Sequence, residues 1–586
     1  MWNSIVPRHS AHSTALLLLI SGLSPSQNPP QNPPPAETTA TTDKNAPELS
    51  SHDSPTTFSS KVNLVMVPVV IRDRAGKPIG TLHQEDFALF DKGKPQVISR
   101  FSVESAARAA VRFATPADDS AGEKPASPAS VQAPAHFVAY VFDDVHTNFG
   151  DLALARDAAQ KQITETLQPS DRVAIFDTSG VTTLDFTDDR DAIQSTLLRL
   201  RPRPKVATAH DCPDVSFYMA DQIENMNNPA ALDAATLDAM SCLGIPQEQR
   251  NVAEQIARSS AAQALNLGDY DTRLALNSLK AVIRRMSAMP GQRTLVLASS
   301  GFHLLLDHRV EETEVMDAAI RANVTINTLD ARGLYTPPEA DASLPGKTYQ
   351  AQMVISQYKR DSAFQEGQVL GELADATGGT WFHNRNDLKE GFRLLAASPE
   401  FTYVLGFSPQ NLKYDGAYHA LKVTLKNSSG LQLQARRGYY APKHRADPEE
   451  QAKEEIREAL FSREEMKDIP VHMQTQFFKP SDITAKLSVL THVDLKSIRF
   501  RKADGRNRNT LTVVAGIFDR NGILINAIQK KIEMFLKDET FEARTAAGLT
   551  IKTTFDVTPG TYVIRLIARD TEGQMMTAQN GAVQIP

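Results

Sequence analysis

The sequence predicts a multidomain protein in which a doubly wound parallel α/β sheet is preceded by a small β module and followed by a second β domain. Two patterns carry this prediction. Between residues 135 and 443, apolar runs suited to strands buried on both faces alternate with segments of helical periodicity. After residue 469, short apolar runs follow one another with turn residues between them. At 586 residues the chain also exceeds the size of a single hydrophobic core.

The α/β pattern begins with an apolar run at residues 136–142, which gives way abruptly to polar residues. Four of these carry side-chain oxygen atoms: Asp143, Asp144, Thr147 and Asn148. A helical stripe at residues 152–167 and a second apolar run at 172–177 complete a strand–helix–strand unit. Ligands of open parallel sheets bind outside the carboxyl ends of the strands, so the four residues are candidates for holding a ligand or a cation.

The alternation continues along the region. Further strands are expected at residues 181–186, 292–298, 324–329, 380–382 and 401–407. Helices are expected between them at residues 188–200, 311–323, 363–377 and 387–397. Strands separated by helices of this length imply a parallel sheet with helices on both faces and right-handed connections.

A mostly helical insertion at residues 201–270 interrupts the alternation and contains both cysteines of the chain, Cys212 and Cys242. In an exported protein, two cysteines in one insertion favour a disulfide. Spacing does not reveal geometry, so two unpaired thiols are the alternative. The insertion is expected either to shape a partner site beside the carboxyl ends of the strands or to pack on the flank of the sheet.

The first 26 residues have the pattern of a secretory signal peptide, with Arg8 ahead of an apolar core at residues 15–23. We therefore predict a secreted, periplasmic or cell-surface protein, with the signal either cleaved or kept as an anchor. No later stretch approaches the roughly 18 apolar residues of a membrane span. Residues 27–58 are rich in Pro, Thr, Ala, Asn and Ser, which predicts a disordered linker.

Residues 59–104 are expected to form a small β module, because apolar runs alternate there with turn residues. Two or three strands are marginally stable alone, so this module should lean on a neighbour. Residues 105–134, rich in Ala, Ser and Pro, are expected to be a second linker.

The last part of the chain begins with a charged segment at residues 444–468, whose apolar residues recur at helical spacing. We expect one connecting helix there. Seven strands are expected after it, at residues 471–477, 483–492, 510–518, 523–535, 549–557, 562–569 and 575–585. Short strands with this punctuation predict an immunoglobulin-like or fibronectin-like β sandwich over residues 469–586. Its turns of the Asp-x-x-Gly kind fit hairpin chemistry, with Ca²⁺ binding as the alternative.

Four stretches carry a resemblance to a known family: residues 69–78 with 86–93, residues 140–144, residues 373–382, and residues 403–407 with 435–440. In this order and spacing, the segment from residue 59 to residue 443 resembles the von Willebrand factor A-related (VWFA-related) proteins of the acidobacterial type. The resemblance covers roughly two thirds of the chain. It implies that residues 135–443 form a von Willebrand factor A-type domain, which is a binding module.

The resemblance also implies a metal-ion-dependent adhesion site. Asp143 matches the first Asp of that site and Thr147 can stand for its second Ser, but Val145 replaces the first Ser. Residues 299–301 lack the expected second carboxylate, although Asp144 and Asn148 could substitute in part. The expectation is a degenerate site for one divalent cation (Mg²⁺, Mn²⁺ or Ca²⁺). The alternative is that these residues cap the following helix and order the loop.

Short catalytic motifs are absent from the sequence, and a formal net charge of -6 argues against a nucleic-acid binder. We therefore expect a non-enzymatic protein for adhesion, scaffolding or protein recognition, with a protein partner and no predicted oligomeric state. One alternative is a cation-dependent envelope hydrolase that uses Asp143 and Asp144 with His146 or His303. Another is a structural envelope component without a ligand.

Overall fold

The computed structural model describes residues 48–55, 65–74, 77–105, 110–111, 131–132, 134, 136–202, 212–334, 349–397, 401–409, 417–427, 430–441, 448–461 and 465–586. The predicted signal peptide and most of the two predicted linkers lie outside these residues. Within the described ranges, no helix has the length and hydropathy of a bilayer span.

Counting the described residues only, six strands form the mixed sheet of the α/β region. In spatial order they are β10 (Thr183–Thr187), β9 (Asp171–Asp177), β8 (His136–Phe142), β11 (Gln292–Ser299), β12 (Val324–Asp330) and β13 (Trp381–Phe382). Neighbours are parallel, except that β10 runs antiparallel to β9. The strand order reverses direction between β8 and β11, which is where sheets of this kind hold their ligands.

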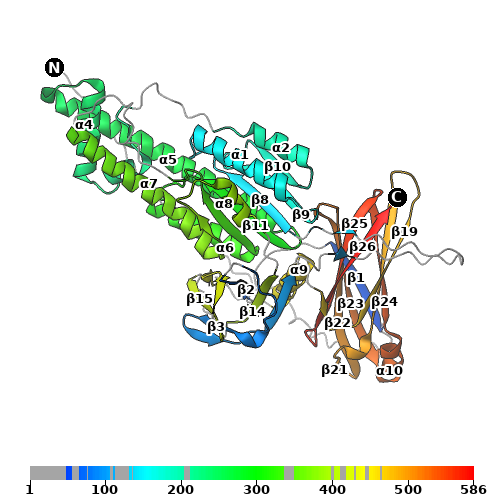
Figure 1. Ribbon diagram of the computed structural model, residues 1–586. Coiled ribbons are helices and arrows are strands. Elements are labelled where there is room, and N and C mark those ends of the chain that lie inside the picture. Colours follow the sequence, from blue (N-terminus) through cyan, green and yellow to red (C-terminus); the bar gives the residue numbers. More distant parts are fainter. Residues whose placement is uncertain are drawn as a thin grey trace, which may run out of the picture. The chain divides into compact units, whose positions relative to one another are not determined.

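Helices cover both faces of this sheet, as Figure 1 shows. One face carries α1 (Phe149–Thr166), α2 (Arg190–Arg199) and α8 (Leu388–Leu395). The other carries α5 (Arg250–Met286), α6 (Arg309–Arg321) and α7 (Tyr349–Thr377). Every residue of β8 is buried as a result, which explains the nearly continuous apolar run in its sequence.

The insertion consists of α3 (Phe217–Glu224), α4 (Pro229–Leu243) and the first part of α5. Its small core is mostly alanine, a composition that lets helices approach closely. A disulfide joins Cys212 to Cys242, with Cα atoms 6.1 Å apart. α7 begins at Tyr349, well before the expected start at residue 363, so it extends from the sheet to the insertion.

Strands from both ends of the α/β region build the β module. Of the residues that the structure describes, one group forms a four-stranded sheet in the order β16 (Leu431–Ala435), β2 (Val65–Asp73), β14 (Phe401–Phe407) and β5 (Arg100–Ser105). A second group forms another, in the order β17 (Gly438–Tyr440), β15 (Tyr418–Leu425), β3 (Phe87–Asp91) and β4 (Lys94–Gln96). Residues of the two sheets share one core.

The placement of β14 corrects the expectation for residues 401–407. We expected this strand to continue the parallel α/β sheet, but it pairs antiparallel with β2 and β5. Its Tyr403 and Leu405 are fully buried in the same core as Val67 and Val69 of β2. An apolar strand is equally suited to either sheet, so its periodicity could not choose between them.

The C-terminal part contains two antiparallel sheets that face each other across one core. The larger, in the described part of the chain, has the order β1 (Leu49–Pro55), β23 (Leu524–Lys537), β22 (Arg506–Phe518), β25 (Gly560–Asp570), β26 (Met576–Ile585) and β18 (Met466–Lys467), with β21 (Arg501–Ala503) beside β22. The smaller has the order β19 (Val471–Phe478), β20 (Ala485–Val493) and β24 (Leu549–Val557). The helices α9 (Pro448–Phe461) and α10 (Asp538–Ala547) accompany them. A further pair of two-residue strands, β6 (Ala110–Val111) and β7 (Val131–Gln132), lies in the predicted second linker.

Two features of this part differ from the expectation. Residues 49–55 fall in the predicted disordered linker but form β1, which pairs with β23 over its whole length. Its residues are mostly polar, and contacts with distant parts of the chain define it: backbone pairing with β23, an ion pair of Asp53 with Lys530, and packing of Leu49 against the core of the two sheets. The helix α10 was not expected, since it follows β23 without a turn signal.

In the Asp-x-x-Gly turns, the Asp side chain accepts hydrogen bonds from backbone N–H groups of the same turn. Asp519 accepts hydrogen bonds from the backbone N–H groups of Asn521 and Ile523, both at 2.8 Å, and Gly522 has a φ of 82°. Asp570 accepts from the N–H groups of Glu572 and Gly573 in the same way. Turn geometry therefore accounts for these carboxylates.

Candidate functional site

The predicted ligand site lies where β8 and β11 end side by side. Asp143 follows β8 directly, and its backbone N–H donates to Ala298 O of β11 at 2.9 Å. This bond continues the pairing of the two strands, so the sheet itself fixes the position of the Asp143 side chain. The side chain is fully buried. A buried carboxylate at the strand-order reversal is the central feature of the candidate site.

Donors from three loops surround the Asp143 carboxylate. The hydroxyl of Ser299, at the end of β11, donates to Oδ2 at 2.6 Å. The hydroxyl of Thr178, which follows β9, lies 2.8 Å from Oδ1. His146 Nδ1 lies 3.0 Å from Oδ2 and 3.1 Å from Oδ1. The backbone N–H groups of Val145 and His146 complete the set. Both carboxylate oxygens are therefore engaged by donors of this chain.

These contacts set the charge state of Asp143. Burial by itself raises the pKa of a carboxyl group, because it disfavours the ionised form. Here the attraction and hydrogen bond of His146, together with the hydroxyls of Ser299 and Thr178, outweigh burial and lower the pKa of Asp143 to about 2. Asp143 is thus an ionised buried carboxylate with a complete set of hydrogen bonds.

Asp144 has a different environment, although it is the next residue. Its Oδ1 accepts from the backbone N–H of Ser179 at 2.9 Å and lies 3.0 Å from the Thr178 hydroxyl. Burial raises the pKa of Asp144, and nearby Asp177 adds to the rise, while the bonds from Ser179 and Thr178 oppose it. The pKa of Asp143 is therefore lowered and that of its neighbour Asp144 is raised. The Thr178 hydroxyl lies within hydrogen-bond distance of both carboxyl groups.

Thr147 and Asn148 face other partners. Thr147 is buried, and its hydroxyl accepts from the backbone N–H of Ser300 at 3.2 Å. Asn148 is exposed and is the N-cap of α1: its Oδ1 accepts from the Asp151 N–H at 2.9 Å. This is the capping role that the sequence left open as the alternative to metal binding.

The four predicted ligands do not fit a divalent cation as they are arranged. A hard cation needs about six convergent oxygen ligands. The Asp143 oxygens already face hydrogen-bond donors, Asn148 caps a helix, and Val145 contributes no ligand atom. The described residues also contain no group of three or more His, Cys, Asp or Glu side chains that could hold a metal. A cation would have to displace the His146 ring to reach Asp143.

The two histidines of the hydrolase alternative, His146 and His303, have different partners. That alternative combined Asp143 and Asp144 with either histidine, and His303 within hydrogen-bond reach of Asp143 would have favoured it. His303 Nε2 lies 3.0 Å from Asp221 Oδ2 of α3, and its ring makes edge contacts with the rings of Phe217 and Tyr218. His146 is the histidine on Asp143, and it stacks on Phe302. His303 therefore ties the insertion to the sheet.

One acidic residue that the sequence did not single out, Glu366, interacts electrostatically with both histidines. Burial raises the pKa of Glu366 on α7, while Ser362, Arg332, His146 and His303 oppose the rise. α7 passes close to the site here, since a Cβ built on Gly301 would lie 2.2 Å from Glu366 O. The residues that the sequence reasoning did not select are Thr178, Ser179, Asp221 and Glu366. Thr178 and Ser179 follow β9 directly, so listing the polar residues after every parallel strand would have found them.

Four apolar side chains are exposed in segments that lie at this edge of the sheet. Their exposed fractions are 66% for Phe149, 84% for Val181, 60% for Leu334 and 65% for Phe364. Phe149 starts α1, Val181 follows β9, and Leu334 follows β12. Arg332, near Leu334, donates to Ala363 O, next to Phe364, and its charge acts on Asp151 of α1. We call these four residues the apolar rim.

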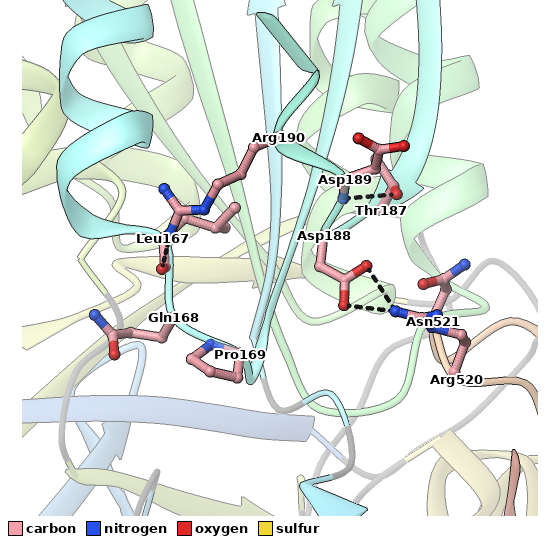
Figure 2. A pocket seen from close by; sticks show the side chains of 9 residues that line it. All are labelled: Leu167, Gln168, Pro169, Thr187, Asp188, Asp189, Arg190, Arg520 and Asn521. Atoms are coloured by element: carbon pink, nitrogen blue, oxygen red, sulfur yellow. Dashed lines mark hydrogen bonds and ion pairs between the residues drawn. The ribbon is translucent and has the colours of Figure 1, made fainter. Parts of the chain in front are cut away.

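A pocket of about 600 Å³ lies at the opposite edge of the sheet, at the amino ends of the parallel strands. Figure 2 shows its lining, which includes Pro169 before β9 and Asp188 after β10. Arg520, from the turn between β22 and β23, pairs with Asp188 at 3.3 Å. Arg172 also reaches Asp188, at 3.3 Å, and donates to Arg520 O. These charges are paired with one another, and none belongs to the predicted site.

Comparisons with known proteins leave the family open. No protein-family model matches the chain. No curated protein matches it either. An aerotolerance-related membrane protein from Bacteroides fragilis NCTC 9343 with multiple mutations to serine is 12% identical, covering 45% of this chain and 98% of its own, with a TM-score of 0.23. The conserved hypothetical protein BatB from Bacteroides thetaiotaomicron is 12% identical, covering 44% and 96%, with a TM-score of 0.20. Dimeric latent PorU from Porphyromonas gingivalis is 14% identical, covering 33% and 14%, with a TM-score of 0.12. Likeness at these TM-scores carries no argument about this chain.

Proposed function

We propose that this chain is an exported, non-enzymatic protein-binding module for adhesion or scaffolding, and that its contact surface is the carboxyl edge of the six-stranded sheet. The observation that carries the proposal is the contrast at this edge. The Asp143 carboxylate is fully buried with both oxygens hydrogen-bonded, while the apolar rim at the same edge of the sheet is exposed. Exposed apolar side chains next to a rigid, fully hydrogen-bonded polar group are typical of a protein contact surface.

The fold assignment in this proposal goes beyond the mixed α/β architecture. We propose that the six-stranded sheet is a von Willebrand factor A-type domain and that the facing antiparallel sheets are an immunoglobulin-like sandwich. The strand order with one antiparallel edge strand supports the first assignment. The shared core of two antiparallel sheets supports the second.

Export is supported by the disulfide between Cys212 and Cys242. Structural disulfides persist in oxidising compartments such as the periplasm and the cell exterior, and are rare in the cytosol. We do not prefer the alternative of a cation-dependent hydrolase. His146 lies on Asp143, but the Asp143 oxygens face hydrogen-bond donors of this chain and His303 pairs with Asp221.

A site-specific photocrosslink tests the proposal. A photoreactive phenylalanine analogue replaces Phe149 in one sample and Leu334 in another, both on the apolar rim. The control replaces Phe478, which is 68% exposed on β19. In the native envelope, we expect both rim positions to give an adduct with the same protein and the control to give none. Adducts that are absent, or equal at all three positions, would contradict the proposal.

Binding to the identified partner then tests the surface quantitatively. The Phe149→Ser/Leu334→Ser double variant should weaken the affinity by roughly 100-fold, since each truncated anchor residue at an interface costs about 1–2 kcal/mol. The matched Phe478→Ser variant should bind as the wild type does. Equal losses in both variants would place the contact elsewhere.

A further inference from the structure

The smaller C-terminal sheet has a long, regular edge at β24. All nine residues of this strand pair with β20, and the pairing runs from Leu549 with Val493 to Val557 with Ala485 without a bulge. On the other side of β24, the described residues provide no paired strand. A row of backbone N–H and C=O groups is therefore available for another strand.

This edge lacks three of the devices that protect edge strands, namely proline, a bulge and a short strand length. Proteins commonly place proline, bulges or short strands at a sheet edge to prevent pairing between molecules. The sequence of β24, LTIKTTFDV, contains neither proline nor glycine. Its outward side chains alternate regularly with buried ones, and the outward set is Thr550, Lys552, Thr554 and Asp556. The two charged residues of this set have opposite signs.

We propose that β24 is a self-association site, at which it pairs antiparallel with β24 of a second copy of this chain. The twofold axis passes through Thr554, so that Lys552 of each copy faces Asp556 of the other. The smaller sheets of the two copies then form one continuous sheet in the order β19–β20–β24–β24–β20–β19. A contact of this kind uses the same surface on both copies, as twofold dimers do.

The charges select this register over its neighbours. A pairing centred on Lys552 would place two lysines opposite each other, and one centred on Asp556 would oppose two aspartates. Directly opposed like charges destabilise a strand pair, whereas opposite charges stabilise it. Centring on Thr553 or Phe555 would place both charges opposite threonine. Only the register centred on Thr554 pairs the charges of both copies.

The rest of the strand is compatible with the same register. On the buried face, Ile551 would lie opposite Val557 and Thr553 opposite Phe555, so apolar and β-branched residues continue across the junction. On the exposed face, Asp556 already pairs with Lys486 of β20 at 2.9 Å. In the dimer it would lie between Lys486 of its own chain and Lys552 of the second copy. Positive and negative charges would therefore alternate across the junction.

A single cysteine at the axis tests the register. The sequence contains two cysteines, and these form the disulfide of the insertion, so an introduced cysteine is the only free thiol. Residues opposed in antiparallel strands have Cα atoms about 4.5–5.5 Å apart, within disulfide range. Under mild oxidation, full-length Thr554→Cys should form a covalent dimer at least fivefold more than Thr550→Cys, which lies on the same face but opposite Thr558. Equal crosslinking of the two variants, or none, would overturn the proposal.

The charge pair gives a second test that does not use cysteine. One strand pair is a small interface, so the dimer should be weak, with a dissociation constant of about 10–100 μM. Sedimentation velocity of the wild type should show concentration-dependent dimers. Lys552→Asp should weaken association at least tenfold, because it opposes two aspartates, and Lys552→Asp/Asp556→Lys should restore it. A wild type that is monomeric up to about 200 μM, or a dimer insensitive to the single change, would overturn the proposal.

Discussion

The Nδ1 atom of His146 lies 3.0 Å from Oδ2 and 3.1 Å from Oδ1 of Asp143. The imidazole thus faces both oxygens of the carboxylate that the sequence suggested as a metal ligand. The two residues are three positions apart in the loop after β8, and the backbone N–H of His146 also donates to Asp143. A side chain of the loop itself therefore provides the electrostatic partner of this buried carboxylate.

This relationship predicts weak cation binding. We expect calorimetric titration of Mg²⁺, Mn²⁺ and Ca²⁺ into the full-length chain to show no binding at micromolar concentrations. The reason is that a cation would have to displace the His146 ring and the hydroxyls that surround Asp143. Micromolar binding that disappears in Asp143→Ala would show that the loop can rearrange into a metal site.

The low pKa of Asp143 predicts a dependence of stability on acid pH. Its pKa is about 2 in the folded protein, below the ordinary value of 3.8, so its ionised form stabilises the fold at pH values above the ordinary value. This contribution, about 2 kcal/mol, should be lost as the pH falls from about 4 to 2. We expect the difference in unfolding free energy between the wild type and Asp143→Asn, measured with urea, to shrink by that amount. A difference that stays constant from pH 5 to pH 2 would contradict the assignment.

The raised pKa of Glu312 predicts that stability falls, and does not rise, as the pH increases towards neutral. Its burial on α6, together with a hydrogen bond and repulsion from Glu372, raises its pKa to about 8, although Arg309 opposes the rise. Folding therefore takes up a proton, and stability should fall as the pH rises from about 4.5 to 8. We expect Glu312→Gln to remove this slope and to be more stable than the wild type at pH 8 by on the order of 1–2 kcal/mol. Parallel urea-unfolding profiles of the two proteins across this range would argue against it.

The close approach of α7 to Gly301 predicts that a side chain at this position destabilises the fold. Its φ of 85° disfavours other residues, and an added Cβ would lie 2.2 Å from Glu366 O of α7. Gly180 is a matched control after β9, because its φ is 77° and nothing lies within 4 Å of its Cβ position. Gly301→Ala should destabilise the fold by about 3–4 kcal/mol and Gly180→Ala by only about 1 kcal/mol. Equal losses in thermal unfolding would mean that α7 does not pack against Gly301.

The disulfide predicts the stability of the insertion. It joins cysteines 30 residues apart, and closing a loop of this length stabilises a protein by about 3–4 kcal/mol in the chain-entropy model. We expect Cys212→Ser/Cys242→Ser to expose α3 and α4 to limited proteolysis while the six-stranded sheet stays protected. A reducing agent should have the same effect on the wild type and no effect on the variant. Unchanged proteolysis would show that helix packing alone holds the insertion.

Local patterns in the sequence predicted many of the elements well. The strand expected at residues 549–557 has the same bounds as β24, and the run at 136–142 is β8. Asn148 caps α1, as one of the two sequence interpretations had it. These features depend on periodicity, capping and turn residues, which act over a few positions and can be read directly from the chain.

The sequence by itself determined where most of the apolar strands lie and which polar residues follow β8, because alternation and burial are encoded in neighbouring residues. Only the tertiary structure decided which strands pair and what surrounds the polar residues. It joins β14 to β2, more than 300 positions away, and β1 to β23 at the other end of the chain. It also places Ser299 and Thr178 on Asp143 from two other loops. Backbone hydrogen bonds accept any strand of suitable pattern, so the choice among partners is made by the packing of the whole core.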